Sequence, residues 1–502
     1  MSITPDTQTT FTPGRLFIGG EWTEPEGGAT IPVINPATEE AFTTAPQASA
    51  NDAAAAIVAA RKAFDDGPWG RSTPRERAGS IRRLGEALER RRAGIAELMV
   101  DEAGIVSAQA DSLNVGPAIE MCYDMADRLL PTFSFSEPVA PYFGPSLSGA
   151  TQLSQGVTLR EPVGVASLIT PFNGPIFVSF MKLAPALAAG CTVVLKPSPY
   201  TPLEILALGD LVQEAGFPDG VVNVITGDLD ASVEMTTNPA VDIVSFTGSD
   251  IVGRKVMEQA SHDLKRVVLE LGGKSANIIF ADADTDRIAA DVVANMTFNT
   301  GQGCMLLTRT LVEESIYDEV VAKAIAMLDH IKVGDPAQPD TFMGPLIRES
   351  ARTRIEGMIN DAQEEGATLA YGGGRPDGLS RGFFLNPTLF TGVDNSMAIA
   401  QREVFGPVQT VIPFKDENDA VRIANDSPYG LNGSVFSADI ERAFRVAQRV
   451  RTGRMNINSQ TVGHPDAPFG GYKHSGMGRE NGLVGISEFV NSKFVSWTAG
   501  NA

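Results

Sequence analysis

Cysteine is scarce in this chain. Its 502 residues include three cysteines, which stand singly and are odd in number: Cys122, Cys191 and Cys304. This usage argues against a disulfide framework and for a reducing compartment, so we expect a cytoplasmic protein. Histidine is also rare, and its four copies have no metal-ligand spacing and no cysteine pair near them. The sequence therefore gives no support to a metal site.

Basic residues are in short supply as well. The chain has 61 acidic and 40 basic residues, which gives a formal net charge of −21 and a pI of about 4.7. The overall field repels phosphate backbones and anionic lipid. We therefore expect neither nucleic acid nor a membrane as a partner.

A long uninterrupted hydrophobic run is missing too. The longest apolar stretch, Pro162–Leu195, contains Asn173, Lys182, internal prolines and Gly190, unlike a membrane-spanning helix. We interpret it as a buried strand, helix and strand. The N-terminal segment Met1–Gly14 lacks the basic-then-apolar order of a signal peptide, so secretion is not expected.

The remaining composition is that of a large globular protein. Hydrophobic residues make up 43% of the chain, and at about 150 residues per domain two or three domains are expected. Short β-rich runs alternate with helical segments from Val163 to Glu270, and again from Ala276 to about Phe436. Such alternation predicts parallel, doubly wound sheets. The first set of strands is expected near Val163–Ile169, Thr192–Leu195, Val221–Ile225, Val241–Phe246 and Arg266–Leu269.

Three further segments give local signals. Thr73–Glu76 has the sequence of a capping box and should begin an amphipathic helix. A helix that starts at Thr201-Pro202 should end at Gly216. The segment Pro138–Leu159 is rich in Pro, Gly and Ser before alternating residues. It is either a hairpin used in assembly or an ordinary surface loop.

Cys304 is the candidate nucleophile. A single cysteine is more often a small buried hydrophobic residue, but this one follows the glycine-bracketed turn Gly301-Gln302-Gly303. The turn comes after a helix that should end near Asn299. Glycine lets the backbone approach a ligand closely, so the thiol is expected to be presented rather than packed.

Two other residues suit the same chemistry. Glu270, in Leu269–Lys274, lies at the end of a predicted strand, where α/β sheets open their ligand crevices. Burial there favours the neutral carboxyl that a base working near neutrality requires, although a capping or arginine-paired carboxylate is the alternative. Asn173 lies between a buried strand and a helix opened by Pro175. Its amide either donates to an oxyanion or caps the helix.

A cofactor cradle is suggested by the next strand end. Gly248 and Ser249 follow the strand Val241–Phe246 and lead into a helix, with Gly253 one turn later. A strand, a glycine turn and a helix N-terminus offer backbone N–H groups to a pyrophosphate, although any tight turn of this kind favours glycine. Lys196, just after another strand, is expected to reach a nucleotide hydroxyl or phosphate, unless it is a surface lysine.

In this order the segments resemble the aldehyde dehydrogenase superfamily over nearly the whole chain. The resemblance runs from Phe17–Trp22 and Asn35–Thr38 to Pro468–Lys473 and Ser475–Glu480. It implies that Cys304 attacks the aldehyde, that Asn173 and the Cys304 N–H hold the oxyanion, and that Glu270 activates the water that hydrolyses a thioester. Lys182 and Glu480 match positions that relay the proton onward.

The resemblance also implies a nicotinamide cofactor. Lys196 matches the contact to the adenosine ribose, Gly248 and Ser249 the pyrophosphate turn, and Glu403 the carboxylate that holds the nicotinamide ribose. Phe405 would pack beside the nicotinamide ring. Four more residues are expected to contribute to the cofactor site: Phe172, Gly227, Gly253 and Leu271.

Several positions depart from the family pattern. Pro199 replaces the carboxylate that usually binds ribose hydroxyls and repels a 2′-phosphate, so we expect NAD with NADP possible. Gly174 and Met181 stand where aromatic residues are frequent, and Met305 and Leu306 follow the nucleophile. We infer a roomy apolar channel for a hydrophobic or aromatic aldehyde.

By the same resemblance, the fold is α/β, with two doubly wound Rossmann-like α/β domains and a small β oligomerisation element. We expect residues 1–140 and 162–272 to form the dinucleotide-binding domain, 273–472 the catalytic domain, and 141–161 with 485–502 the oligomerisation element. Because that element leaves a sheet edge to be covered, a homodimer or homotetramer is expected.

Three other functions are weighed against this one. A Cys-Glu-Lys amide or nitrile hydrolase could use Cys304, Glu270 and Lys182, but it has no use for a dinucleotide cradle. A binding or structural protein with this fold would not need Cys304, Glu270 and Asn173 together. An acylating aldehyde dehydrogenase would pass the acyl group to coenzyme A, whereas the presence of Glu270 favours water.

Overall fold

The computed structural model describes residues 14–147, 149–460 and 464–499. Its largest sheet has eight strands in the order β19-β11-β10-β7-β8-β9-β1-β2. The five central strands are parallel, and β1, β2 and β19 join them antiparallel. The strands are β1 (Leu16–Ile18), β2 (Glu21–Thr23), β7 (Val165–Ile169), β8 (Thr192–Lys196), β9 (Val222–Val224), β10 (Ile243–Thr247), β11 (Arg266–Glu270) and β19 (Gly476–Met477).

Both faces of this sheet are buried. Along β7, Ala166 and Leu168 belong to one hydrophobic core, whereas Val165 and Ile169 belong to another on the opposite face. This alternation is what a strand with period-2 side chains needs when helices cover it on both sides. The covering helices are α1 (Ala50–Asp65), α2 (Pro74–Arg90), α3 (Arg92–Ala103), α4 (Ser107–Ala110), α5 (Gly116–Asp124), α6 (Leu130–Thr132), α7 (Pro175–Ala189), α8 (Leu203–Leu206), α9 (Leu208–Glu214), α10 (Leu229–Thr237), α11 (Asp250–Ser261) and α18 (Gly482–Glu488).

A second sheet of seven strands follows in the order β14-β15-β16-β13-β12-β17-β18, parallel except for the β14–β15 pair. It too has a core on each face. Its strands are β12 (Ala276–Ile279), β13 (Arg309–Glu313), β14 (Thr368–Tyr371), β15 (Thr388–Thr391), β16 (Val408–Phe414), β17 (Gly433–Phe436) and β18 (Asn456–Ile457). Its helices are α12 (Thr285–Thr297), α13 (Tyr317–Leu328), α14 (Glu349–Glu364), α15 (Ala398–Gln401), α16 (Glu417–Asn425) and α17 (Ile440–Arg449).

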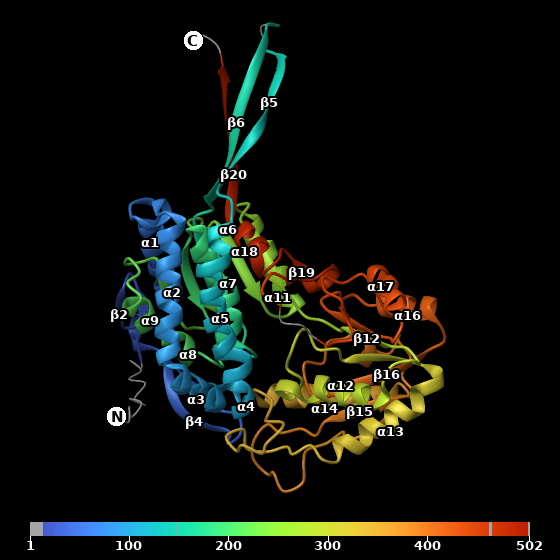
Figure 1. Cartoon of the computed structure of the whole chain (residues 1–502). Coiled ribbons are helices and arrows are strands. Elements are labelled where there is room, and N and C mark those ends of the chain that lie inside the picture. Colours follow the sequence, from blue (N-terminus) through green and yellow to red (C-terminus); the bar gives the residue numbers. More distant parts are fainter. Residues whose placement is uncertain (1–13, 148, 461–463, 500–502) are drawn as a thin grey trace, which may run out of the picture.

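A third, antiparallel sheet projects away from the rest of the molecule (Figure 1). It consists of β5 (Ser136–Pro145), β6 (Thr151–Pro162) and β20 (Val490–Ala499), with β6 in the middle. The hairpin in Pro138–Leu159 is thus confirmed and the surface-loop alternative is wrong, while its use in assembly stays a prediction. A separate two-stranded ribbon pairs β3 (Thr30–Asn35) with β4 (Glu40–Pro46).

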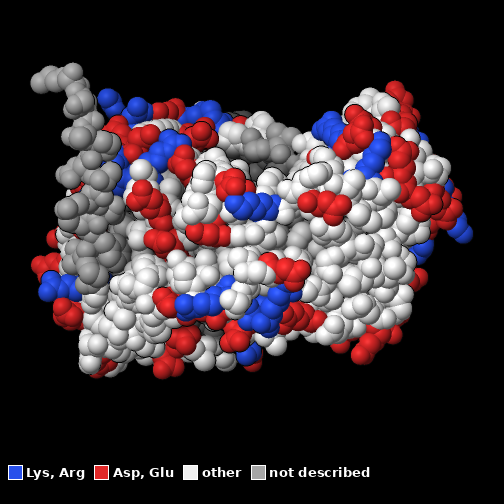
Figure 2. Space-filling model, turned by 90° about the horizontal axis from the view of Figure 1, so that it is seen from below, with Lys and Arg blue, Asp and Glu red and all other residues white. Residues whose placement is uncertain are grey.

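The local predictions are mostly confirmed. Thr73 and Glu76 form the expected reciprocal capping box at the start of α2. The helix expected from Pro202 to Gly216 is divided at Ala207 into α8 and α9. In the part of the chain that the structure covers, no helix is long and apolar enough to cross a membrane. On the face that Figure 2 shows, acidic and basic side chains are interspersed and no continuous basic patch is seen.

Candidate active site

The turn that carries Cys304 lies just beyond α12. Asn299 and Thr300 both have left-handed backbone angles, φ 45° and 56°, and Gly301 continues the run at 70°. A non-glycine residue in this region costs roughly 1 kcal/mol or more, so surrounding contacts must hold it. Gly301 approaches the Gly406 carbonyl so closely that no Cβ would fit. The turn is therefore fixed by packing rather than by local preference.

Cys304 itself is half-buried, whereas Cys122 and Cys191 are fully buried. Gly273, three residues after β11 ends at Glu270, approaches the Cys304 carbonyl so closely that a side chain would not fit. Burial, together with the negative charges of Glu403 and Glu270, raises the pKa of the Cys304 thiol to about 12. The expectation that this thiol is presented rather than packed agrees with its exposure, but its ligand-free form is the protonated thiol.

Glu270 is the last residue of β11 and is 2% exposed. Neither of its carboxyl oxygens has a hydrogen-bond partner among the described residues. Burial and the nearby Glu480 raise its pKa well above the ordinary value, against smaller opposing effects of Lys182 and Arg479. Burial therefore favours the neutral form of this carboxyl, and because its oxygens have no partner, the alternative of a capping or arginine-paired carboxylate is wrong.

Lys182 and Glu480 form a buried ion pair between α7 and the segment before α18. The Lys182 ammonium also donates to the Ser245 hydroxyl at 3.0 Å. Because both charges act on the Glu270 pKa, the three side chains form one electrostatic group. Glu270 and Glu480 lie 88 and 298 positions after Lys182 in the sequence. The fold thus brings the three residues together, as the resemblance implied.

Asn173 lies in the loop between β7 and α7. The N-cap residue of α7 is Gly174, and no side-chain hydrogen bond caps this helix. The capping alternative for Asn173 is therefore wrong. Its backbone carbonyl accepts a hydrogen bond of 2.8 Å from the Asn299 amide, which connects it to the turn before Cys304.

The turn at the start of α11 has the predicted strand, glycine and helix arrangement. Ser249 begins the helix, and its hydroxyl accepts from the Val252 N–H at 3.3 Å. Gly248 lies against the Phe246 ring, and Gly253 packs on Leu271 so tightly that a Cβ would be 2.6 Å from its methyl group. The turn therefore has the strand, glycine and helix N-terminus of a phosphate cradle, although the Gly248 N–H donates to the Glu270 carbonyl at 3.0 Å.

Lys196, at the end of β8, is 3% exposed, so the surface-lysine alternative is wrong. Its ammonium donates to the carbonyls of Gly227 at 2.9 Å and Pro197 at 3.1 Å. Burial lowers its pKa to about 8. Lys196 and Gly227, both predicted cofactor residues, are therefore direct neighbours.

Glu403 lies in the loop between α15 and β16, beside the loop that follows β11. Its carboxylate accepts from the Gly273 N–H at 2.8 Å and occupies the space that a side chain on Gly272 would need. Burial raises the pKa of Glu403 to about 7, against lowering by the Gly273 N–H and Lys274. The Phe405 ring lies 5.8 Å from that of Phe172, edge to face.

Three residues near the site escaped the sequence analysis. Asn299 holds the nucleophile turn, Arg348 donates to the Tyr200 hydroxyl across the crevice, and Lys274 is buried. The Lys274 ammonium has no hydrogen-bond partner among the described residues, and burial with the nearby Arg309 lowers its pKa to about 7. Lys274 is the last residue of the Leu269–Lys274 motif, from which the sequence predicts a role only for Glu270.

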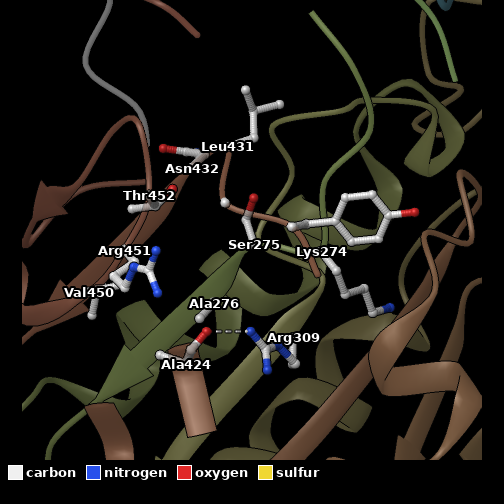
Figure 3. A pocket seen from close by; sticks show the side chains of 12 residues that line it. Lys274, Ser275, Ala276, Arg309, Ala424, Leu431, Asn432, Val450, Arg451 and Thr452 are labelled. Atoms are coloured by element: carbon white, nitrogen blue, oxygen red, sulfur yellow. Dashed lines mark hydrogen bonds between the residues drawn. The ribbon is translucent and has the colours of Figure 1, made fainter. Parts of the chain in front are cut away.

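Lys274 also borders a depression of about 250 Å³ that is partly open to solvent. Figure 3 shows the Lys274 stem running away from Ser275, while Arg309 donates to the Ala424 carbonyl. The depression lies on the side of the second sheet, beside β12, and contains none of the predicted catalytic side chains. The predicted catalytic residues are instead gathered where β11, α7 and the Cys304 turn meet.

This arrangement places a half-buried cysteine near a buried carboxyl in an α/β fold. The sequence model of the aldehyde dehydrogenase family matches residues 22–495, and the chain belongs to this family. The enzyme class and the α/β fold class expected from the sequence are thus confirmed, and the hydrolase and non-enzymatic alternatives are wrong.

Individual relatives cover almost the whole chain. It is 40% identical to betaine aldehyde dehydrogenase of Bacillus subtilis, over 96% of each chain, and 41% identical to 3-succinoylsemialdehyde-pyridine dehydrogenase of a Pseudomonas species, over 96% of this chain and 98% of the relative. Among solved structures, betaine aldehyde dehydrogenase of Staphylococcus aureus with NAD+ has a TM-score of 0.93 at 37% identity, covering 98% and 95%. A mutant of aldehyde dehydrogenase C of Pseudomonas syringae, complexed with NAD+ and octanal, has a TM-score of 0.91 at 39% identity, covering 98% of each chain.

The raised thiol pKa leads to a prediction for alkylation. In the ligand-free protein, the rate at which iodoacetamide modifies Cys304 should rise about tenfold per pH unit from pH 7.5 to 9.5, because the thiolate is the reactive form and its pKa lies above this range. Peptide mass spectrometry after timed quenching measures it. A plateau near pH 8.5 would show an ordinary thiol.

A matched variant tests the cause. Glu403→Gln removes a negative charge from beside the thiol, which lowers the Cys304 pKa and should speed alkylation at pH 9. Below pH 6 the effect should vanish, since Glu403, with a pKa of about 7, is already neutral in the parent protein. An equal effect at both pH values would point to altered packing instead.

Proposed function

We propose that this chain oxidises a hydrophobic aldehyde, aliphatic or aromatic, to its carboxylic acid, with NAD as the hydride acceptor. The observation that carries the proposal is the pairing of a half-buried Cys304 with Glu270, a buried carboxyl whose oxygens have no partner and whose pKa is raised. A carboxyl with a raised pKa is, once ionised, a stronger base than an ordinary carboxylate, and without a hydrogen-bond partner it is free to take a proton from water.

In the proposed reaction, the Cys304 thiol loses its proton to solvent, the sulfur bonds to the aldehyde carbon, and the carbonyl oxygen becomes an oxyanion. The Asn173 amide and the Cys304 N–H stabilise that charge. A bound nicotinamide supplies the hydride acceptor. Loss of hydride converts the hemithioacetal into a thioester, and Glu270 then takes a proton from the water that attacks it. The C–S bond breaks, which releases the acid and the thiolate.

The proton taken by Glu270 needs a path away from the buried site. The Lys182–Glu480 ion pair acts electrostatically on Glu270 and is itself hydrogen-bonded to Ser245. We assign to this pair the transfer of the proton toward solvent. The burial of the pair supports the assignment, because a buried ion pair generally adds little to the stability of a protein. Stability alone therefore does not explain why this pair is present.

The residues at the cofactor crevice fit a dinucleotide. Gly248, Ser249 and Gly253 lie at the N-terminus of α11, where a pyrophosphate would bind, and Gly272 leaves room for Glu403, which would hold the nicotinamide ribose. Lys196, with Gly227, would contact the adenosine ribose, and Phe172, Leu271 and Phe405 would line the remaining surface. Relatives of known structure bind NAD+.

Pro199 extends the proposal to NADP. Because no carboxylate follows Ser198, a 2′-phosphate meets no like charge at this position. We therefore expect measurable turnover with NADP, and we expect Pro199→Glu to reduce kcat/KM for NADP by about tenfold or more while NAD is retained. Initial rates with both cofactors check this.

The substrate class rests on apolar surroundings. Met181 and Leu306 are buried, Met305 is half-buried, and Gly174 adds no side chain next to Asn173. The Pseudomonas syringae relative was crystallised with octanal, which is consistent with an apolar channel.

An initial-rate screen of aldehydes with both cofactors tests the proposed function. Octanal and benzaldehyde should be oxidised with a higher kcat/KM than acetaldehyde, because each added buried methylene contributes about 0.8 kcal/mol to binding. Betaine aldehyde and amino aldehydes belong in the same screen, since several relatives carry those names. A clear preference for acetaldehyde, or for the cationic substrates, would contradict the hydrophobic assignment.

The predicted domains and assembly belong to the same proposal. Division into residues 1–140 with 162–272, 273–472, and 141–161 with 485–502 is supported by the three sheets. Exposed aromatic residues on the third sheet, Tyr142, Phe143, Phe494 and Trp497, support a homodimer or homotetramer. Light scattering coupled to size-exclusion chromatography measures the mass of the assembly and therefore its number of subunits. A cytoplasmic location remains a proposal from cysteine usage.

A further inference from the structure

One side-chain amide joins the two loops of the proposed oxyanion site. The Asn299 Nδ2 donates to the backbone carbonyl of Asn173 at 2.8 Å and to that of Gln302 at 3.2 Å. A primary amide has two N–H donors, and here each has its own acceptor. Because a carbonyl oxygen can only accept, this orientation of the amide is fixed by its partners.

The backbone of Asn299 is held as firmly as its side chain. Its N–H donates to the Gln109 side-chain oxygen at 3.2 Å, and its carbonyl accepts from the Gln302 N–H at 3.0 Å. Gln302 in turn accepts from the Ile347 N–H at 3.0 Å. Segments around residues 109, 173, 302 and 347 therefore converge on this one turn.

We propose that Asn299 is a positioning residue that sets the distance between the two oxyanion donors, the Asn173 amide and the Cys304 N–H. This inference rests on the proposed role of Asn173. The Asn299 amide contacts neither donor. It holds the backbone carbonyl of Asn173 on one side and, on the other, that of Gln302, two residues before Cys304. A shift of about 1 Å between catalytic groups is enough to cost on the order of 100-fold in rate.

A simpler role must be separated from this one. Asparagine tolerates left-handed backbone better than most residues, so Asn299 could serve only its own φ of 45°. Asn299→Gly keeps that backbone without steric cost and removes both donors. Asn299→Asp keeps the shape but places carboxylate oxygens against two carbonyl oxygens.

Stopped-flow measurement of the first hydride transfer distinguishes the two roles. If Asn299 positions the donors, Asn299→Gly should slow the NADH burst by about 10- to 100-fold, and Asn299→Asp at least as much. The KM for NAD and the iodoacetamide rate at Cys304 should stay within about threefold. A burst within twofold of the parent, or a burst and alkylation rate reduced by the same factor, would overturn the inference.

A double-mutant cycle with Asn173→Ala gives the second test. Asn173→Ala alone tests the proposed oxyanion role, and an unchanged burst there would refute that role. If Asn173→Ala does slow the burst, adding Asn299→Gly should cost less than about threefold further, because its effect passes through Asn173. If the reductions in burst rate caused by the two substitutions multiply in full, the positioning role of Asn299 is overturned, while the proposed function is left intact.

Discussion

Alanine at position 304 should lower aldehyde-dependent formation of reduced cofactor by roughly 10⁴-fold or more. Without the Cys304 sulfur no hemithioacetal forms, and a free aldehyde carbon does not release hydride readily. Absorbance at 340 nm with a large excess of aldehyde and NAD measures the loss. Binding of NAD, followed by the quenching of tryptophan fluorescence, should persist, which separates lost chemistry from lost folding.

The two remaining cysteines provide matched controls for this experiment. Cys122 and Cys191 are both fully buried, and burial raises the pKa of each thiol above its usual range. Cys122→Ala and Cys191→Ala should therefore keep their turnover at a temperature well below unfolding, although each loses some packing. Activity above about one per cent in Cys304→Ala would place the nucleophile elsewhere.

The periodicity of the sequence was sufficient to predict the two large sheets. Every strand expected between Val163 and Leu269 is present within two residues of its predicted bounds. Runs such as Val165–Ile169 are apolar at nearly every position because both faces of a parallel strand are buried. The break at Ala207, by contrast, was not predicted, although Gly209, two residues later, is a poor helix former.

Residue type and strand position were sufficient to predict much of the candidate site. The raised pKa of Glu270 follows from its place at the end of a buried strand, and its direction was expected. The burial of Lys196 was left open, because a lysine is usually exposed. It is buried here because two carbonyls, from Pro197 and Gly227, accept from its ammonium, and the second is 31 residues away.

Contacts over long sequence separations explain what was missed. The Asn299 amide finds the Asn173 carbonyl across 126 residues, and the Arg348 guanidinium finds Tyr200 across 148. Neither partner is signalled by spacing, because such contacts depend on how the two large sheets meet. The glycines of the Leu269–Lys274 motif are a similar case: Gly272 makes room for Glu403 and Gly273 for the Cys304 backbone.

Glu270→Gln should separate the two halves of the reaction. Glutamine has the shape of the neutral carboxyl that burial favours at this position, so the fold should be retained. Acylation does not need the base, and the first turnover should give a rapid burst of NADH near one equivalent per site. Hydrolysis of the thioester does need it, so the steady-state rate should fall by about 10²- to 10⁴-fold. Stopped-flow absorbance resolves both phases.

The pH dependence of the steady-state rate is an independent test of Glu270 as the base. In the parent enzyme the base form of Glu270 is populated only above its raised pKa, so steady-state kcat should increase as pH rises through that value and fall below it. In Glu270→Gln this dependence should disappear from the slow phase. An unchanged steady-state rate in the variant would show that another group activates water.

The acyl acceptor can be identified with the same variant. Hydroxylamine attacks a thioester without help from a base, so it should restore steady turnover in Glu270→Gln by releasing the acyl group from Cys304. Coenzyme A should have no such effect if water is the natural acceptor. If coenzyme A accelerates the parent enzyme as well as the variant, the enzyme is acylating, and Glu270 has a different task from the one proposed.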